Sequence, residues 1–235
     1  MNQDFFKKPT IQLNNNNSFA QKAKELFYSI LWMYGFLFLV TILMKITDFF
    51  IYQSTAFSYF ETVVNQQNKN FGNYPIYYII IVAPIIEEII FRLPLTLKKQ
   101  HIIIGLSFLG ILLIKNVFLK FNELKFISAL YFCLFVAAVT VAIKFVNQSF
   151  LDKIKDNYYP IYFYSFCIIF GLFHIINFVK IVPANLLIFA PIFTLPQITI
   201  GYFAGYNRLT NGFLWGVLLH ILYNLPGALI LLAHK

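Results

Sequence analysis

Apolar runs of about 20 residues recur from one end of this 235-residue chain to the other. A helix of that length extends about 30 Å, which matches the hydrocarbon thickness of a bilayer. Only 11% of the residues are charged, against roughly 25% in soluble domains. The runs are continuous and lack the period of two that a membrane β-barrel needs. The sequence therefore predicts an all-α, polytopic transmembrane helical bundle.

Seven apolar segments define the expected spans: 26–46, 75–97, 101–119, 127–147, 160–180, 183–206 and 212–233. The mixed segment 48–74 is consistent with a short interfacial helix, so we expect seven to eight spans in total. Prolines interrupt the sixth segment, and such breaks are tolerated at membrane depth where helices pack or line a cavity. Residues 1–25 are expected to form a polar cytoplasmic tail, and residues 26–233 a single transmembrane domain.

The net charge of +9 is explained by membrane orientation rather than by nucleic acid, which we exclude as a partner. Short loops rich in lysine and arginine stay in the cytoplasm. The alternate loops that fall on the side of the N-terminus hold Lys7, Lys8, Lys22, Lys24, Lys98, Lys99, Lys153, Lys155 and Arg208, whereas the opposite loops hold Lys69, Lys120 and Lys125. This asymmetry predicts a multi-pass protein of the cell (inner) membrane, in contact with membrane lipids and with a cytoplasmic N-terminus. Cys133 and Cys167 lie in apolar runs, which argues against a disulfide framework.

Two glutamates and an arginine interrupt the second apolar segment, in the stretch IVAPIIEEIIFRLPL at 81–95. Each charge at a helix centre costs about 2.5–3.5 kcal/mol on insertion scales. Glu88 and Arg92 are four residues apart and share a helix face, so they can pair. Glu87 lies about 100° round the helix from Glu88 and has no such partner. A packing ion pair therefore explains Glu88 and Arg92 as supporting residues but leaves Glu87 to another role.

Two later segments carry histidines within apolar surroundings. Phe170 and His174 are four apart in FGLFH, and His220 and Asn224 are four apart in WGVLLHILYN. A single histidine on an apolar face is more often a packing residue than a ligand. However, Glu87, His174, His220 and Asn224 all fall roughly 12–21 Å from the expected cytoplasmic surface. Four polar groups at one depth on three helices are expected to meet in one cavity.

Such a cavity is consistent with two kinds of chemistry. In the first, the carboxylate of Glu87 and the imidazole of His174 deprotonate a water, while His220 and Asn224 donate to an oxyanion. In the second, Glu87, His174 and His220 are zinc ligands with a position left open for water. The absence of an HExxH signature favours the metal-free site, so no cofactor is expected although zinc is possible. Either chemistry is hydrolysis of an acyl group, above all a peptide bond.

Three motifs in order resemble those of a known family. EEIIFR at 87–92 matches an EExxxR motif, FGLFH at 170–174 an FxxxH motif, and HILYN at 220–224 an HxxxN motif. Together they resemble the CPBP intramembrane proteases, which include the type II CAAX prenyl proteases and lysostaphin-resistance-A-like bacterial proteins. The resemblance covers about 75–233, with its core at 75–97 and 160–233.

The resemblance implies an intramembrane endopeptidase that acts on a peptide or protein, with or without an attached lipid, by a metallo- or glutamic mechanism. In such a family, the positions that match Glu87 and His174 act on water, and those that match His220 and Asn224 bind the oxyanion. The chain departs from the family pattern because two extra apolar segments, 101–119 and 127–147, follow the first motif. An even number of added helices preserves the direction of the next one, but an added hairpin can reshape the substrate entrance.

Two other classes of function remain open on the sequence alone. Intramembrane carboxylates and histidines also relay protons or ions in transporters, although this chain shows no repeated half with matched helix breaks. A non-catalytic member of such a family would bind a peptide in the same cavity and act as an immunity or scaffold protein.

Overall fold

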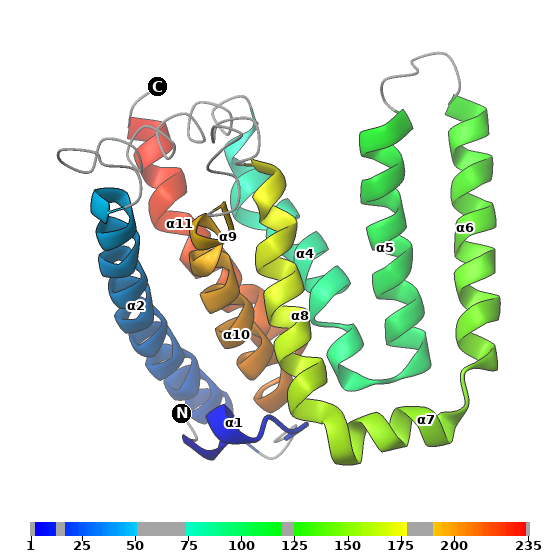
Figure 1. Cartoon of the computed structure of the whole chain (residues 1–235), viewed down its shortest axis with the longest axis horizontal. Helices are drawn as coiled ribbons and strands as arrows, with labels where there is room; N and C mark the ends of the chain where they lie inside the picture. The colour runs from blue at the N-terminus through cyan, green and yellow to red at the C-terminus, as the bar shows by residue number, and fades with distance from the viewer. Residues whose placement is uncertain (1–2, 13–16, 51–73, 119–124, 178–189, 234–235) are drawn as a thin grey trace.

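The computed structural model describes residues 3–12, 17–50, 74–118, 125–177 and 190–233 (Figure 1). These residues form helices and the turns that join them, with no strand in any of the five ranges. The expected all-α class is therefore confirmed for the part of the chain that is described.

The helices in chain order are α1 (Gln3–Lys7), α2 (Phe19–Phe50), the π-helix η1 (Tyr78–Val82), α4 (Ala83–Phe91), the 3₁₀-helix η2 (Pro94–Thr96), α5 (Lys99–Phe118), α6 (Lys125–Phe145), α7 (Gln148–Lys153), the π-helix η3 (Ile154–Tyr158), α8 (Tyr159–Phe173), the 3₁₀-helix η4 (His174–Asn177), α9 (Ala190–Phe193), α10 (Leu195–Thr210) and α11 (Phe213–Ala233). Most run along one axis, whereas α7 lies across it at one end of the bundle (Figure 1).

Three helical stretches among the described residues are long and apolar enough to cross a membrane: Phe19–Thr47, Gln148–Asn177 and Phe213–Leu232. Two shorter apolar helices, Lys99–Leu113 and Leu130–Phe145, accompany them. This composition is that of a membrane protein. The larger count of seven to eight spans stays a prediction.

The second expected span, 75–97, is helical, but its hydrogen-bond pattern changes along its length. It consists of η1, α4 and η2 in succession. Pro84 interrupts the backbone ladder at the start because proline has no N–H, and Pro94 opens the 3₁₀ turn at the end.

The sixth expected span also differs, since residues 183–189 lie outside the description, α9 ends at Phe193, and α10 runs on to Thr210. The interfacial helix expected within 48–74 falls mostly on residues 51–73, outside the described residues.

Within the segment 1–25, which was expected to be a polar tail, α1 packs against the bundle and residues 19–25 form the start of α2. Phe5 on α1 is fully buried. Its ring centroid lies 5.4 Å from that of Phe163 and 4.9 Å from that of Tyr206, both edge-on. The Gln12 backbone N–H also donates to the Leu209 carbonyl at 3.0 Å. Aromatic residues within an otherwise polar segment thus anchor the tail to α8 and α10.

Helix α10 is the centre of the bundle. Every residue from Ile200 to Asn211 is buried, between α2, α8 and α11. Glycines allow this close approach, because a Cβ on Gly205 would stand 2.8 Å from the Phe163 ring. The helix that precedes the last motif is therefore a packing element for the helices that carry the candidate site.

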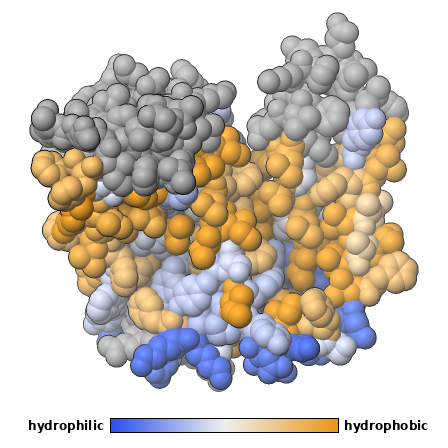
Figure 2. Space-filling model, in the orientation of Figure 1, coloured by the Kyte–Doolittle hydropathy of each residue, from blue (hydrophilic) through white to orange (hydrophobic). Residues whose placement is uncertain are grey.

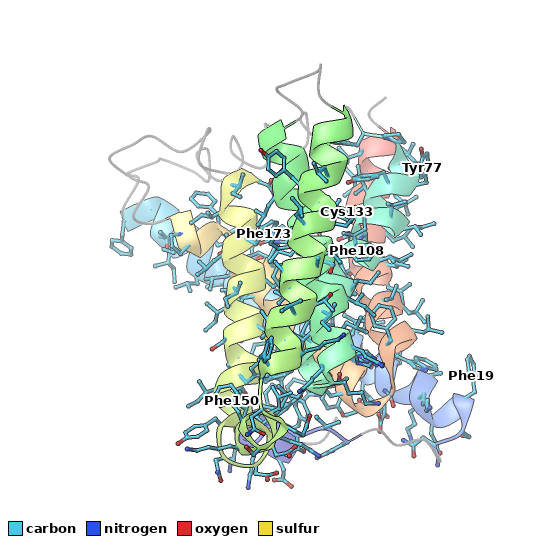
Figure 3. The ribbon with its side chains drawn as sticks, turned by 90° about the vertical axis from the view of Figure 1, so that its right-hand side faces the viewer. Phe19, Tyr77, Phe108, Cys133, Phe150 and Phe173 are labelled. Carbon is cyan, nitrogen blue, oxygen red and sulfur yellow. The ribbon has the colours of Figure 1, made fainter. Side chains whose placement is uncertain are left out.

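Basic residues gather at one end of the bundle. Helix α1, the α4–α5 turn, α7 and the end of α10 all lie at that end (Figure 1), and its surface is hydrophilic (Figure 2). Phe150 marks this end and Tyr77 the opposite one (Figure 3). Lys69 and Lys120 of the expected opposite loops lie outside the described residues.

Candidate active site

Three helices bring Glu87, His174 and His220 together. Glu87 Oε2, on α4, lies 3.7 Å from His174 Nε2 at the end of α8 and 3.6 Å from His220 Nε2 on α11. The side chains of Glu87 and His174 are 23% and 17% exposed, so the group can be reached from outside the bundle. The structure thus brings together three of the four residues at which the sequence placed the chemistry.

The change from α to 3₁₀ geometry at His174 orients its imidazole. The His174 backbone N–H donates to the Gly171 and Leu172 carbonyls and not to the Phe170 carbonyl, as it would in a regular α-helix. The Phe170 carbonyl can therefore accept another hydrogen bond. His174 Nδ1 lies 2.8 Å from that Phe170 oxygen and is assigned as the donor, because a carbonyl can only accept. In the neutral ring, Nε2 then carries a lone pair and faces Glu87.

A second carboxylate orients His220. Its Nδ1 lies 2.9 Å from Glu88 Oε1 and donates to that oxygen, and its side chain is 4% exposed. The hydrogen bond turns the other ring nitrogen, Nε2, toward Glu87. A carboxylate that holds one nitrogen of an imidazole fixes the orientation of the ring. Adjacent glutamates thus contact His220 from two sides.

The ion pair expected from the spacing of Glu88 and Arg92 is present. Arg92 Nε lies 3.5 Å from Glu88 Oε1, and the two side chains are 2% and 0% exposed. The guanidinium carbon also lies 3.9 Å from the centroid of the Phe170 ring, a cation–π distance. Within the described residues the three guanidinium nitrogens form no hydrogen bond. Attraction to Glu88 and stacking on Phe170 therefore hold this buried cation.

Phe170 is a packing centre whose importance the sequence analysis missed. This fully buried ring meets the His174 ring at 4.8 Å and the His220 ring at 5.8 Å between centroids, edge-on in both cases. Its face carries Arg92. Spacing marked Phe170 only as a neighbour of His174, whereas the contact with His220 depends on tertiary packing.

Asn224 donates a hydrogen bond to a backbone carbonyl that Pro84 leaves without a donor. The Ala83 N–H bonds to the Tyr78 carbonyl, and Pro84 has no N–H to offer the Ile79 carbonyl one residue on. Asn224 Nδ2 donates to that Ile79 oxygen at 3.1 Å. The amide thereby ties α11 to η1. The expected role of Asn224 in binding an oxyanion stays a prediction, and it would use the second hydrogen of the same amide.

Gly216 completes the face of α11 that carries His220 and Asn224. The three are spaced by four residues, so they share one side of the helix. A Cβ on Gly216 would stand 3.0 Å from the Ala204 carbonyl oxygen and 3.4 Å from Glu88 Oε2. The four-residue spacing was visible in the sequence, but the need for a small residue there was not.

The three candidate zinc ligands lie close together, with Glu87 Oε2 3.7 Å and 3.6 Å from the imidazole nitrogens of His174 and His220. Among the described residues, no group of three histidine, cysteine, aspartate or glutamate side chains is placed to hold a metal ion. The choice between a metal-free site and a zinc site stays a prediction.

Comparison of the chain with models of known protein families, with characterised proteins and with solved structures finds no match. The assignment of a function therefore rests on the geometry of this site and on the three motifs.

Proposed function

We propose that the protein is a multi-pass intramembrane peptidase of the CPBP kind, in which Glu87 and His174 activate water. The observation that carries the proposal is the position of Glu87 Oε2, within 3.7 Å of an imidazole nitrogen from each of two other helices. A carboxylate beside two imidazoles in an apolar bundle is costly to bury. Its partial exposure beside them is expected of a group that meets water and substrate.

The residues suggest a balanced hydrolysis. A water donates one hydrogen to Glu87 Oε2 and the other to the bare Nε2 of His174. Glu87 takes its proton as the water oxygen attacks the peptide carbonyl carbon, and it later passes that proton to the leaving nitrogen when the C–N bond breaks. Protonated His220, held by Glu88, donates from Nε2 to the carbonyl oxygen as negative charge develops there. The second amide hydrogen of Asn224 is proposed to do the same.

In this scheme His174 accepts a hydrogen bond from the water at Nε2, because its Nδ1 donates to the Phe170 carbonyl.

The membrane placement belongs to the same proposal. We place the chain in the cell (inner) membrane with seven to eight crossings, the N-terminus in the cytoplasm and the basic end of the bundle on the cytoplasmic side. The substrate would be a peptide or protein segment near the membrane, with or without an attached lipid. The α5–α6 hairpin stands beside the motif helices in Figure 1, where it can shape the entrance.

Purified protein in liposomes, incubated with a peptide library, tests the proposal. Mass spectrometry is expected to find new N- and C-termini at defined peptide bonds. Tight retention of peptides without cleavage would instead support the non-catalytic binding protein, and a proton or ion flux without cleavage would support the transporter. Either of these two results overturns the peptidase.

A further inference from the structure

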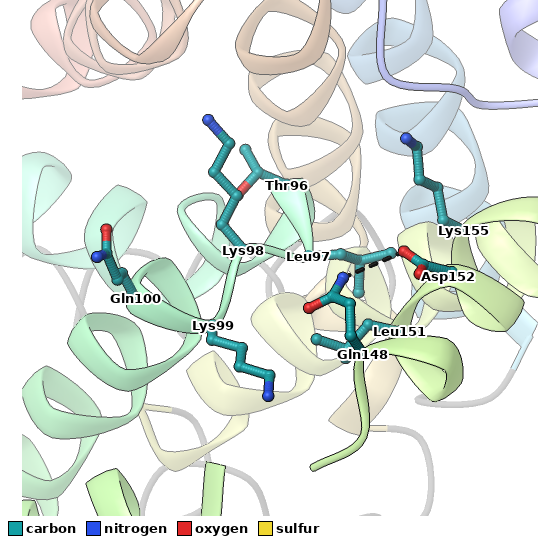
Figure 4. A pocket seen from close by; sticks show the side chains of 9 residues that line it. All are labelled: Thr96, Leu97, Lys98, Lys99, Gln100, Gln148, Leu151, Asp152 and Lys155. Atoms are coloured by element: carbon teal, nitrogen blue, oxygen red, sulfur yellow. Dashed lines mark hydrogen bonds between the residues drawn. The ribbon is translucent and has the colours of Figure 1, made fainter. Parts of the chain in front are cut away.

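A basic pocket of about 450 Å³ lies at the end of the bundle where α4 turns into α5. One side comes from that turn and the start of α5, and the other from α7 and η3 (Figure 4). Its lining residues are Thr96, Leu97, Lys98, Lys99, Gln100, Gln148, Leu151, Asp152 and Lys155. None of them belongs to the glutamate–histidine group, so the pocket is a separate feature.

The charge of the pocket suits an anion. Three lysines stand against one aspartate, a net formal charge of +2. Asp152 accepts from the Gln148 amide at 3.1 Å, and Lys99 Nζ donates to the Lys144 carbonyl at 3.3 Å. Over the described part of the chain, the ammonium groups of Lys98 and Lys155 form no hydrogen bond or ion pair. They are therefore available to a ligand.

The backbone adds to this positive potential. Helix α5 begins at Lys99, and the first N–H groups of a helix have no partner within it. Leu97 has a left-handed backbone conformation with φ 56°, which ends η2. Lys98 and Lys99 come directly after this turn. Buried Leu97 and Leu151, each 5% exposed, provide an apolar base.

The position of the pocket selects the kind of anion. Helix α7 lies across the bundle beside it (Figure 1). Phe145 and Phe150, which flank the start of α7, are 85% and 57% exposed. An exposed apolar side chain, Phe150, thus stands on the same helix that lines the pocket, and it lies at this end of the bundle (Figure 3). Lipid headgroups lie at that level in the membrane placement proposed above, and basic pockets on the cytoplasmic side suit anionic headgroups.

We propose that this pocket binds the phosphate of an anionic phospholipid, with Lys98 and Lys155 as its charged contacts. The lipid chains would lie against the apolar surface near Phe145 and Phe150. Such a ligand would bridge the α4–α5 turn and η3. The turn is already held to α8, because Tyr159 and Tyr162 donate to the Leu95 and Pro94 carbonyls at 2.7 and 3.0 Å. The inference rests on the membrane placement and not on peptidase activity.

Native mass spectrometry of the detergent-purified full chain, titrated with dioleoyl-phosphatidylglycerol, tests the proposal. We expect phosphatidylglycerol to bind at least about tenfold more tightly than phosphatidylcholine with the same chains. The double variant Lys98→Gln/Lys155→Gln is expected to lose about tenfold or more of this affinity. The control Lys22→Gln/Lys24→Gln removes two basic residues outside the pocket and is expected to bind as the unmodified protein does. The thermal unfolding midpoint without lipid shows that each variant is folded.

Three outcomes would overturn the inference. They are equal binding of the two lipids, unchanged affinity in the pocket variant, and an equal loss in the control variant. A further arm adds inorganic phosphate alone, which shares the phosphate chemistry without the lipid chains. Displacement of phosphatidylglycerol by millimolar phosphate would assign the pocket to a free phosphate and contradict the lipid.

Discussion

At the scale of single residues, adjacent Glu87 and Glu88 have different surroundings. Glu88 is fully buried and contacts Arg92 and His220, whereas Glu87 is 23% exposed and faces two imidazoles. The 100° rotation between neighbouring helix positions produces this division. Spacing alone predicted the pair of Glu88 with Arg92. It did not predict the bond from Glu88 to His220, since that contact depends on how α11 packs against α4.

Removal of Arg92 is expected to prevent stable folding. Arg92→Ala leaves Glu88 buried without its cation, and breaking a buried pair costs about 3–5 kcal/mol. Arg92→Lys keeps the charge but loses the planar stack on Phe170, so a smaller loss is expected. The yield of monodisperse protein and its thermal unfolding midpoint measure both. Wild-type stability in Arg92→Ala would show that Glu88 does not depend on this partner.

At the scale of elements, the breaks in the helices position the site. The π-helix η1 and Pro84 leave the Ile79 carbonyl for Asn224, and the switch to 3₁₀ at His174 leaves the Phe170 carbonyl for its imidazole. The sequence predicted helices from apolar length, and α5, α6 and α11 lie close to the expected segments. It did not predict the breaks within 75–97, because length and hydropathy report burial in lipid and not the local hydrogen-bond pattern.

Asn224→Ala is expected to weaken the contact between α11 and η1. Loss of a side-chain hydrogen bond within a membrane bundle costs about 0.6–1.7 kcal/mol. The free energy of unfolding in a detergent–denaturant titration is expected to fall by that amount, and peptide cleavage to slow. Asn224→Asp is the matched variant, since it keeps the size but lacks the donor. Unchanged unfolding energy in both would contradict the tie to Ile79.

The docking of α1 gives a second test at this scale. Phe5→Ala removes a fully buried ring and is expected to lower the free energy of unfolding by about 3–5 kcal/mol. Phe19→Ala is the control, because Phe19 is 80% exposed. Equal effects of the two substitutions would mean that the tail does not anchor in the bundle. The aromatic residues of the tail were visible in the sequence, but their partners lie more than 150 residues away on α8 and α10.

At the scale of the whole molecule, the basic residues share one end while the glutamate–histidine group lies within the bundle. Counts of lysine and arginine in the sequence anticipated this shared end. They could not show the basic pocket, because it forms only where the α4–α5 turn meets α7. The sequence anticipated that Glu87, His174 and His220 converge, because each lies at a similar distance from the expected cytoplasmic end of its apolar segment. Their distances depend on the packing of α8 and α11 around buried Phe170.

Cysteine labelling tests the orientation of the molecule. In a variant with Cys133→Ser and Cys167→Ala, a single Lys153→Cys is expected to resist a membrane-impermeant maleimide in intact cells and to react after lysis. Tyr77→Cys, near the opposite end, is expected to react in intact cells (Figure 3). The reverse pattern would place the N-terminus outside.

The central claim, that Glu87 and His174 activate water, is tested most directly by initial cleavage rates in liposomes. A positioned general base contributes roughly 10²–10⁴-fold to a rate, so Glu87→Gln and His174→Gln are each expected to fall at least about 100-fold while remaining folded. His101→Gln is the matched control, because His101 bonds to Thr96 outside the site. This control is expected to cleave at a near wild-type rate. A folded Glu87→Gln variant that cleaves peptide at the wild-type rate would show that Glu87 does not activate the water.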